Sequence, residues 1–426
     1  MLSPIDELQH IDYLDRAAHG HLLHEGQQVQ TLAMREESCR GGVEAVGLPG
    51  GTKCGGPYDP NKYQELGRNT ADIHPPTYYL LTGPVARVLV ASGLWSDFVD
   101  AGRALGGVWL AAGLWFLALS LRRLGASRAL TGVAVLSLAV SPLVIRATSI
   151  VSNDATTLLS GSLLLYVCIR HRQGDRALGP LLVSSAIAAS LRPTGILAVI
   201  AAAGVLLLAA PLHDGAADEA PAEPPRAAAP GFATLRGWLT WSRARAPVLM
   251  LVTAFVAQEA WLAIRGALAV HSPVPNLIAE RQHVTSLAMG QVTGSVHAFL
   301  PLLGDDLATN TGTEHVHELL VTLLSWALVA AAAAVFMTAR RAETLPTLGG
   351  VAITSLVVGG PFLVITTFLS QSAYFDIPQR YGVALMPFVV AAAVSGSNTL
   401  TRRLLFGLFV SSAVLGWYIL LTTWTI

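Results

Sequence analysis

The sequence predicts an all-α polytopic membrane protein with about ten transmembrane helices. Hydrophobic residues make up 53% of the 426 residues and charged residues only 13%, about half of the roughly 25% charge of an average soluble protein. Apolar runs of about twenty residues, the length that crosses a bilayer, recur from residue 103 onward. Much of the surface must therefore face lipid, and the zero net charge gives no reason to expect a nucleic-acid partner.

The predicted membrane helices follow directly from these apolar runs. They lie at 103–121, 128–148, 152–169, 178–192, 194–212, 246–265, 318–338, 346–369, 382–398 and 404–424. The stretch 77–95 is also apolar, but a crossing there would place Arg122 and Arg123 on the outer side. We therefore expect 77–95 to form a helix in the outer interface, interrupted at Gly83-Pro84.

Arginines fall in alternate loops between these spans and so predict the orientation. They are Arg122, Arg123 and Arg128; Arg170, Arg172 and Arg176; Arg226, Arg236, Arg243 and Arg245; Arg340 and Arg341; and Arg402 and Arg403. Cytoplasmic loops collect positive charge, which places this set inside and the loops 149–153, 266–317 and 370–381 outside. We thus divide the chain into an extracytoplasmic part, 1–102, with juxtamembrane helices, and a transmembrane helical domain, 103–426. The domain includes a cytoplasmic linker, 213–245, and the long outer loop 266–317.

The first polar cluster on the outer side is the segment 3–13. In a helix that starts at Pro4, Asp6 and His10 are four residues apart and share one face. A carboxylate at the membrane surface could act as a general base for an acceptor hydroxyl. The alternative is that Asp6 and Glu7 only interact favourably with the helix dipole.

Two more clusters contain candidate anion-binding residues. His74 lies between Asp72 and two prolines that start the next helix, where an anionic group could dock. Arg380, followed by Tyr381, lies where the last outer loop re-enters the membrane, a costly place for a cation unless it meets an anion such as a lipid phosphate. The alternatives are a rigid turn with an interfacial histidine, and an arginine that snorkels to phospholipid headgroups.

Three further features leave alternatives open. Asp154, in Ser152-Asn153-Asp154, either contributes to a site or belongs to a helix N-cap. Cys39 and Cys54 lie in the polar N-terminal segment and form either a disulfide worth roughly 3 kcal/mol or two free thiols. The histidines of the loop 266–317 fit no closed zinc pattern, so we expect no metal site.

Taken together, these motifs resemble the GT-C superfamily of membrane glycosyltransferases, and within it a bacterial group. The resemblance covers most of the chain and rests on short motifs in a fixed order: SPIDELQHIDYL, HPPTYYLL, SNDATTLL, LRPTG and IPQRYGVALMP. It implies a GT-C-like fold in the bacterial cytoplasmic membrane with the active site facing outside. The family also has a transmembrane helix before its acidic motif, whereas only five residues precede Asp6 here. We therefore expect this sequence to begin after that helix.

The resemblance also implies a reaction, in which a sugar passes from a polyprenyl-phosphate donor to a glycan, lipid or protein acceptor of the cell envelope. The partners would be membrane lipids, the lipid-linked donor and an acceptor that the sequence does not identify, with no cofactor. The implied roles are a catalytic carboxylate at Asp6 with Glu7 beside it; donor-phosphate contacts at His74, Arg380 and Tyr381; and possible substrate contacts at His10, Asp72 and Asp154.

Two other classes of protein fit the same composition. A transporter or flippase of lipid-linked sugars would use similar basic and aromatic outer residues without a chemical step. Transporters usually show internal repeats and charges in mid-membrane, whereas only Glu259 lies well inside a predicted span here. A non-catalytic assembly protein is the third class.

Overall fold

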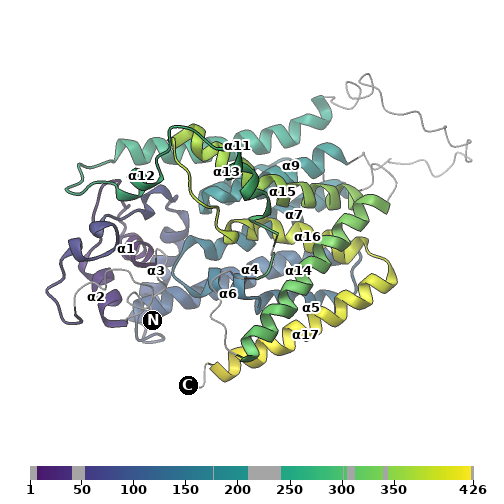
Figure 1. The fold of residues 1–426 in the computed structure, drawn as a ribbon, viewed down its shortest axis with the longest axis horizontal. Coiled ribbons are helices and arrows are strands. Elements are labelled where there is room, and N and C mark those ends of the chain that lie inside the picture. Colours follow the sequence, from purple (N-terminus) through teal and green to yellow (C-terminus); the bar gives the residue numbers. More distant parts are fainter. Residues whose placement is uncertain are drawn as a thin grey trace, which may run out of the picture.

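The computed structural model describes residues 7–40, 53–175, 177–209, 241–300, 302–304, 312–338 and 344–423. Across these residues the regular elements are α-helices and short 3₁₀ helices, accompanied by two isolated β-bridges. The predicted all-α class is therefore confirmed. Figure 1 shows a helical bundle with the N-terminal segment gathered at one end.

Five helices of the described residues are long and apolar enough to cross a membrane. They are α4 (Phe98–Arg123), α11 (Trp241–Ala267), α14 (Gly312–Thr338), α15 (Thr344–Gln371) and α17 (Thr399–Thr423). A sixth span is possible if α5 (Arg128–Ala139) and α6 (Pro142–Ser149), which meet at an angle of 59°, count as one broken crossing. The chain is a multi-pass membrane protein.

The remaining predicted crossings coincide with shorter helices, so the count of ten is not confirmed in the described ranges. These helices are α7 (Thr157–Arg172), α8 (Gly179–Leu191), α9 (Ile196–Leu208) and α16 (Met386–Gly396). The 3₁₀ segments η5 (Asn153–Thr156), η6 (Pro193–Gly195) and η8 (Gln379–Leu385) adjoin them. Proline explains one of the breaks, because Pro193 lacks an N–H and holds Arg192 in an extended conformation, which ends α8.

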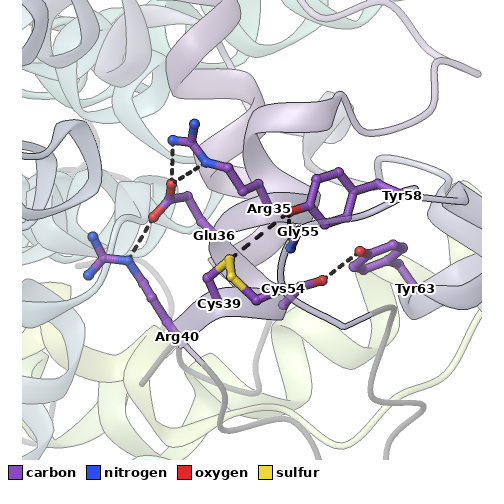
Figure 2. Close-up of a disulfide and its surroundings, with 9 residues drawn as sticks. Arg35, Glu36, Cys39, Arg40, Cys54, Gly55, Tyr58 and Tyr63 are labelled. Carbon is purple, nitrogen blue, oxygen red and sulfur yellow. Dashed lines mark hydrogen bonds and ion pairs between the residues drawn. A yellow bond between two sulfur atoms is a disulfide. The ribbon is translucent and has the colours of Figure 1, made fainter.

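The N-terminal segment forms its own small core against the bundle. It contains α1 (Glu7–Ala18), α2 (Thr31–Arg40) and α3 (Thr77–Ala91), with 3₁₀ segments η2 (Pro60–Lys62), η3 (Gln64–Gly67) and η4 (Ala71–Ile73). Buried Leu14, Tyr13 and Tyr79 pack together with Val151 of the bundle. A disulfide joins Cys39 of α2 to Cys54 (Figure 2), which settles the choice between a disulfide and free thiols in this structure.

The apolar stretch after His74 forms one continuous helix, α3, so the interruption expected at Gly83-Pro84 is wrong. Gly83 instead brings two helices together, since a Cβ on it would lie 2.6 Å from the Leu14 carbonyl oxygen of α1. On its outward side α3 exposes Leu81, Val85 and Val88. This apolar face is what a helix resting on lipid requires.

The long outer loop contains α12 (Leu277–Gln282), α13 (Met289–Gly294) and η7 (Ser295–His297). Most of the predicted linker 213–245 lies outside the described residues, as do Arg176, Arg226, Arg236, Arg340 and Arg341. The domain division therefore stays a prediction.

Arginines of the predicted cytoplasmic set gather near the end of α4 that is remote from α1. Helix α4 starts beside α1, where Arg103 contacts Glu7, and ends at Arg123; the preceding Arg122 lines a cavity together with residues at the start of α17. There Arg123 and Arg170 both lie over the Tyr166 ring, 5.4 and 5.9 Å from its centroid. The bundle thus has an arginine-rich end and an end covered by the N-terminal segment.

Close packing of α7 against η8 depends on Gly161. A Cβ at this position would lie 2.1 Å from the carbonyl oxygen of Ala384, so the two backbones are in direct contact. We expect Gly161→Ala to lower the free energy of unfolding by about 2 kcal/mol through overpacking, measured as a fall in Tm in detergent. Gly132→Ala in α5 is the control, because a Cβ there meets nothing within 4 Å. A Gly161→Ala protein as stable as wild type would contradict this packing.

Candidate functional site

A cavity of about 40 Å³ lies where the N-terminal segment meets the bundle. Five of the residues singled out in the sequence line it: His10, His74, Asp154, Arg380 and Tyr381. They come from α1, the loop before α3, η5 and η8, which are far apart in the chain. Ser152, Arg146 and Arg192 also line it. The cavity therefore brings together all five of the motifs quoted above. LRPTG contributes Arg192, and the other four contribute His10, His74, Asp154 with Ser152, and Arg380 with Tyr381.

Asp154 is the centre of the cavity's charged groups. Its Oδ2 lies 2.9 Å from Arg380 Nε, and its Oδ1 forms an ion pair with Arg192. The side chains of Asp154 and Arg192 are only 5% and 4% exposed, whereas that of Arg380 is 21% exposed. Two guanidinium groups and one carboxylate leave one positive charge uncompensated among these three side chains. Asp154 is thus part of the site and more than a helix cap.

Arg192 is the site residue that the motif analysis did not single out. It lies at the break between α8 and η6, and its guanidinium lies over the Tyr381 ring, 4.6 Å from the centroid. In the sequence, Arg192 is marked only by its place in the motif LRPTG. The sequence signal that could have identified Arg192 is an Arg-Pro break inside an apolar stretch, because an arginine inside such a stretch needs an anionic or aromatic partner.

The two histidines are stacked and neutral. Their ring centroids are 5.3 Å apart, and His10 Nδ1 lies 2.5 Å from the Tyr79 hydroxyl oxygen. Burial, followed by the charges of Arg192 and Arg380, lowers the pKa of His10 to about 3. Burial and the neighbouring His10 hold the pKa of His74 well below its ordinary value. Both rings therefore act at neutral pH through hydrogen bonds and not through charge.

His74 offers the cavity a free hydrogen-bonding atom. Its Nδ1 is buried and has no hydrogen-bond partner among the described residues. On the opposite side of the histidine stack, His10 Nε2 lies 3.4 Å from Ser152 Oγ. A ligand in the cavity would meet a polar imidazole nitrogen on one side and guanidinium groups on another, an arrangement suited to an anion that also carries hydroxyl groups.

Glu7 occupies a different place from the one expected for a catalytic carboxylate. It is fully buried, and its two oxygens each lie 2.8 Å from a nitrogen of the Arg103 guanidinium. Oε1 also accepts a hydrogen bond of 3.0 Å from the Val151 N–H. Glu7 thereby ties α1 to α4 and to the segment that leads into Ser152 and Asp154. We infer that it positions the site without contacting a substrate.

Asp72 is not among the residues that line the cavity. Asp72 is buried, and its carboxylate lies 3.5 Å from Arg265 at the end of α11, which also pairs with Glu25. Burial raises the pKa of Asp72, and the charge of Arg265 opposes this. Asp72 thus connects η4 to α11. Asp6, the expected base, precedes the described residues.

Comparisons with protein-family models, curated proteins and solved structures give no match. The chemistry must therefore be argued from the cavity itself. In the part of the chain that the structure describes, no group of three or more His, Cys, Asp or Glu side chains is arranged to hold a metal ion. The cavity's distinctive property is a lining with three arginines, two of them paired with Asp154, and neutral imidazoles beside them, which favours a negatively charged oxygen ligand.

The low pKa values of His10 and His74 predict acid sensitivity. An unfolded histidine titrates near pH 6.5, and a lowered folded-state pKa means that the unfolded chain binds more protons below that pH. The histidine contribution is therefore fully present above pH 6.5 and is lost as the pH falls toward 3. We expect Tm in detergent to fall between pH 7 and pH 5. The fall in Tm should be smaller in the double variant His10→Gln/His74→Gln and as large as in wild type in the exposed control His21→Gln. The same fall in Tm in wild type and in both variants would refute the role of His10 and His74 in acid sensitivity.

The buried pair of Glu7 and Arg103 predicts a loss of stability on mutation. Glu7→Gln keeps an acceptor for the Val151 N–H but removes the carboxylate charge that faces Arg103, so we expect a loss of about 3 kcal/mol, measured as a lower Tm. Arg103→Gln should cost at least as much, because it removes the guanidinium charge that faces a fully buried carboxylate. Arg87→Gln, at an exposed position on α3, is the control and should change little. Wild-type stability in Glu7→Gln would show that the pair contributes nothing.

Proposed function

We propose that this protein is a GT-C-type glycosyltransferase of the bacterial cytoplasmic membrane. It would transfer a sugar from a polyprenyl-phosphate donor to a cell-envelope acceptor on the outer side. One observation carries the proposal: Arg192 and Arg380, from distant parts of the chain, share the Asp154 carboxylate in a cavity beside two neutral histidines. Cations this deep require an anion, and the donor phosphate is one that a membrane provides.

The arrangement supports different roles for Arg192 and Arg380. Arg192 is almost fully buried and is held by Asp154 and the Tyr381 ring, so it is a fixed charge. Arg380 is the more exposed partner and can exchange its carboxylate for the incoming phosphate. The cavity volume of about 40 Å³ is far below the roughly 300 Å³ of a small-ligand site. We therefore propose that Arg380 moves away from Asp154 when the donor enters.

The reaction needs a base on one side of the sugar and a cation on the other. An acceptor hydroxyl oxygen forms a bond to the anomeric carbon as the bond from that carbon to the phosphate oxygen breaks. The electron pair leaves with the polyprenyl phosphate, whose charge the arginines stabilise, and the hydroxyl proton passes to a carboxylate. The resemblance assigns the base to Asp6, which directly precedes α1. Glu7, with both oxygens held by Arg103, is unsuited to this role.

Three features support the outward orientation and the GT-C-like arrangement. The candidate cavity is lined by His10 of α1, which contacts the start of α4 through Glu7 and Arg103, whereas Arg122, Arg402 and Arg403 lie by the other end of α4, the separation that the positive-inside rule predicts for an outer site. The disulfide between Cys39 and Cys54 belongs to an oxidising compartment. The exposed apolar face of α3, the helix that follows the cavity residue His74, offers a surface for the lipid tail. Counting the five long helices, the bent pair α5 and α6 as one crossing, and α7, α8, α9 and α16 as one crossing each, we propose about ten crossings.

Sugar transfer in membranes containing the full chain tests this function. The assay follows radiolabel from polyprenyl-phosphate sugars into material that is no longer lipid-extractable. We expect Asp6→Asn to lower transfer by roughly 10²-fold or more through loss of the base. Arg380→Gln should lower it by roughly 10²-fold through loss of leaving-group stabilisation. The matched control is Arg281→Gln, an exposed arginine of the outer loop outside the cavity.

The outcomes separate the rival functions. Transfer at wild-type rate in both Asp6→Asn and Arg380→Gln would remove the proposed mechanism. Movement of lipid-linked sugar across the bilayer without transfer would favour a flippase, which needs the cations but no base. A loss of transfer in Arg281→Gln equal to that in Arg380→Gln would show that outer charge in general, and not the cavity, is responsible.

A further inference from the structure

A second cavity lies at the arginine-rich end of the bundle and belongs to no function considered so far. Its volume is about 470 Å³, and it opens between the start of α5 and the start of α17. These two helices pack side by side; Figure 1 shows them next to each other at the end remote from α1. Among the described residues three arginines line it, namely Arg122, Arg402 and Arg403, and no carboxylate does.

The three arginine charges are not neutralised within the described residues. Arg402 Nη2 donates a hydrogen bond of 2.7 Å to the Ser395 carbonyl oxygen, and Arg122 Nη1 donates to the Ala126 carbonyl oxygen. Carbonyl oxygens orient these two guanidinium groups without cancelling their charge. Arg403 is exposed and has no hydrogen bond or ion pair to any described residue. Three like charges around one cavity repel each other, and a bound anion would relieve that repulsion.

Apart from the hydroxyl residues Ser127 and Thr399, the remainder of the lining is apolar. Leu130 of α5 and Phe406 of α17 border the cavity, and Leu404 next to it is 61% exposed. Phe406 lies three residues after Arg403, which places it about 4.5 Å further along the helix axis. The lining therefore changes from charged to apolar along a helix that spans the membrane. A ligand that fits has an anionic headgroup followed by a hydrocarbon chain.

We propose that this cavity binds the headgroup of an anionic phospholipid from the leaflet on the arginine-rich side. The arginines would contact the lipid phosphate, and Leu130 and Phe406 would contact the start of an acyl chain. A free phosphate would leave the apolar wall uncovered, and a zwitterionic lipid would bring its own cation toward the arginines. Basic pockets between membrane helices bind anionic lipids in this way. The proposal is independent of the glycosyltransferase assignment.

Native mass spectrometry of the delipidated full chain tests this proposal. The protein is titrated separately with phosphatidylglycerol, with phosphatidylcholine, and with phosphatidylglycerol in the presence of inorganic phosphate. We expect phosphatidylglycerol to bind more tightly than phosphatidylcholine, with no displacement by phosphate. Arg403→Gln should weaken phosphatidylglycerol binding about fivefold, and Arg122→Gln/Arg403→Gln about 25-fold, at about 1 kcal/mol per basic residue.

Arg128→Gln provides the matched control. Arg128 is exposed at the start of α5, at the same end of the bundle, but it does not line the cavity. Its variant removes the same charge and should keep wild-type phosphatidylglycerol affinity. Equal weakening of phosphatidylglycerol binding in Arg128→Gln and Arg403→Gln would show that general surface charge causes the effect, and would overturn the proposal. Equal affinity for the two lipids, or displacement by inorganic phosphate, would also overturn it. Lipid-free Tm values equal to wild type establish that the variants are folded.

Discussion

Asp154 lies between Arg192 and Arg380 because helix breaks place all three residues at one point of the bundle. Each charge alone would be costly in an apolar body, and the cost is offset only while the three groups remain together. Two guanidinium groups pair with one carboxylate, which leaves a positive balance among the three. The sugar transfer that we propose, in which a lipid phosphate is attracted and later released, would use this combination of fixed charge and exchangeable partner.

The surroundings of this ion cluster hold it in place from two directions. Glu7 and Arg103 connect α1 to α4, and the Val151 N–H bound by Glu7 fixes the chain just before Asp154. On the other side, Gly161 lets α7 contact the backbone of η8, which carries Arg380. The histidine stack completes the wall from the N-terminal segment. The site is therefore a junction between two parts of the chain, and neither part contains it alone.

The sequence predicted the membrane character, the all-α class and the polar residues that meet in the cavity. It predicted the spans less well, because an apolar run does not reveal where a helix breaks inside it. The run 178–212 contains α8, η6 and α9, and Pro193 in the middle places Arg192 in the site. The run 77–95 shows the opposite error, since α3 continues through Pro84 while α1 packs against Gly83.

By itself the sequence determined that the chain resides in a membrane and which end of its helices carries arginine, because both depend on composition and on charge position along the chain. Only the tertiary structure decided which polar residues share a cavity. It joined His10, His74, Asp154 and Arg380 and added Arg192. It also showed that Glu7 pairs with Arg103 and that Asp72 pairs with Arg265. The physical reason is that a buried charge takes the partner that folding brings within reach, and residues close together in the chain need not be that partner.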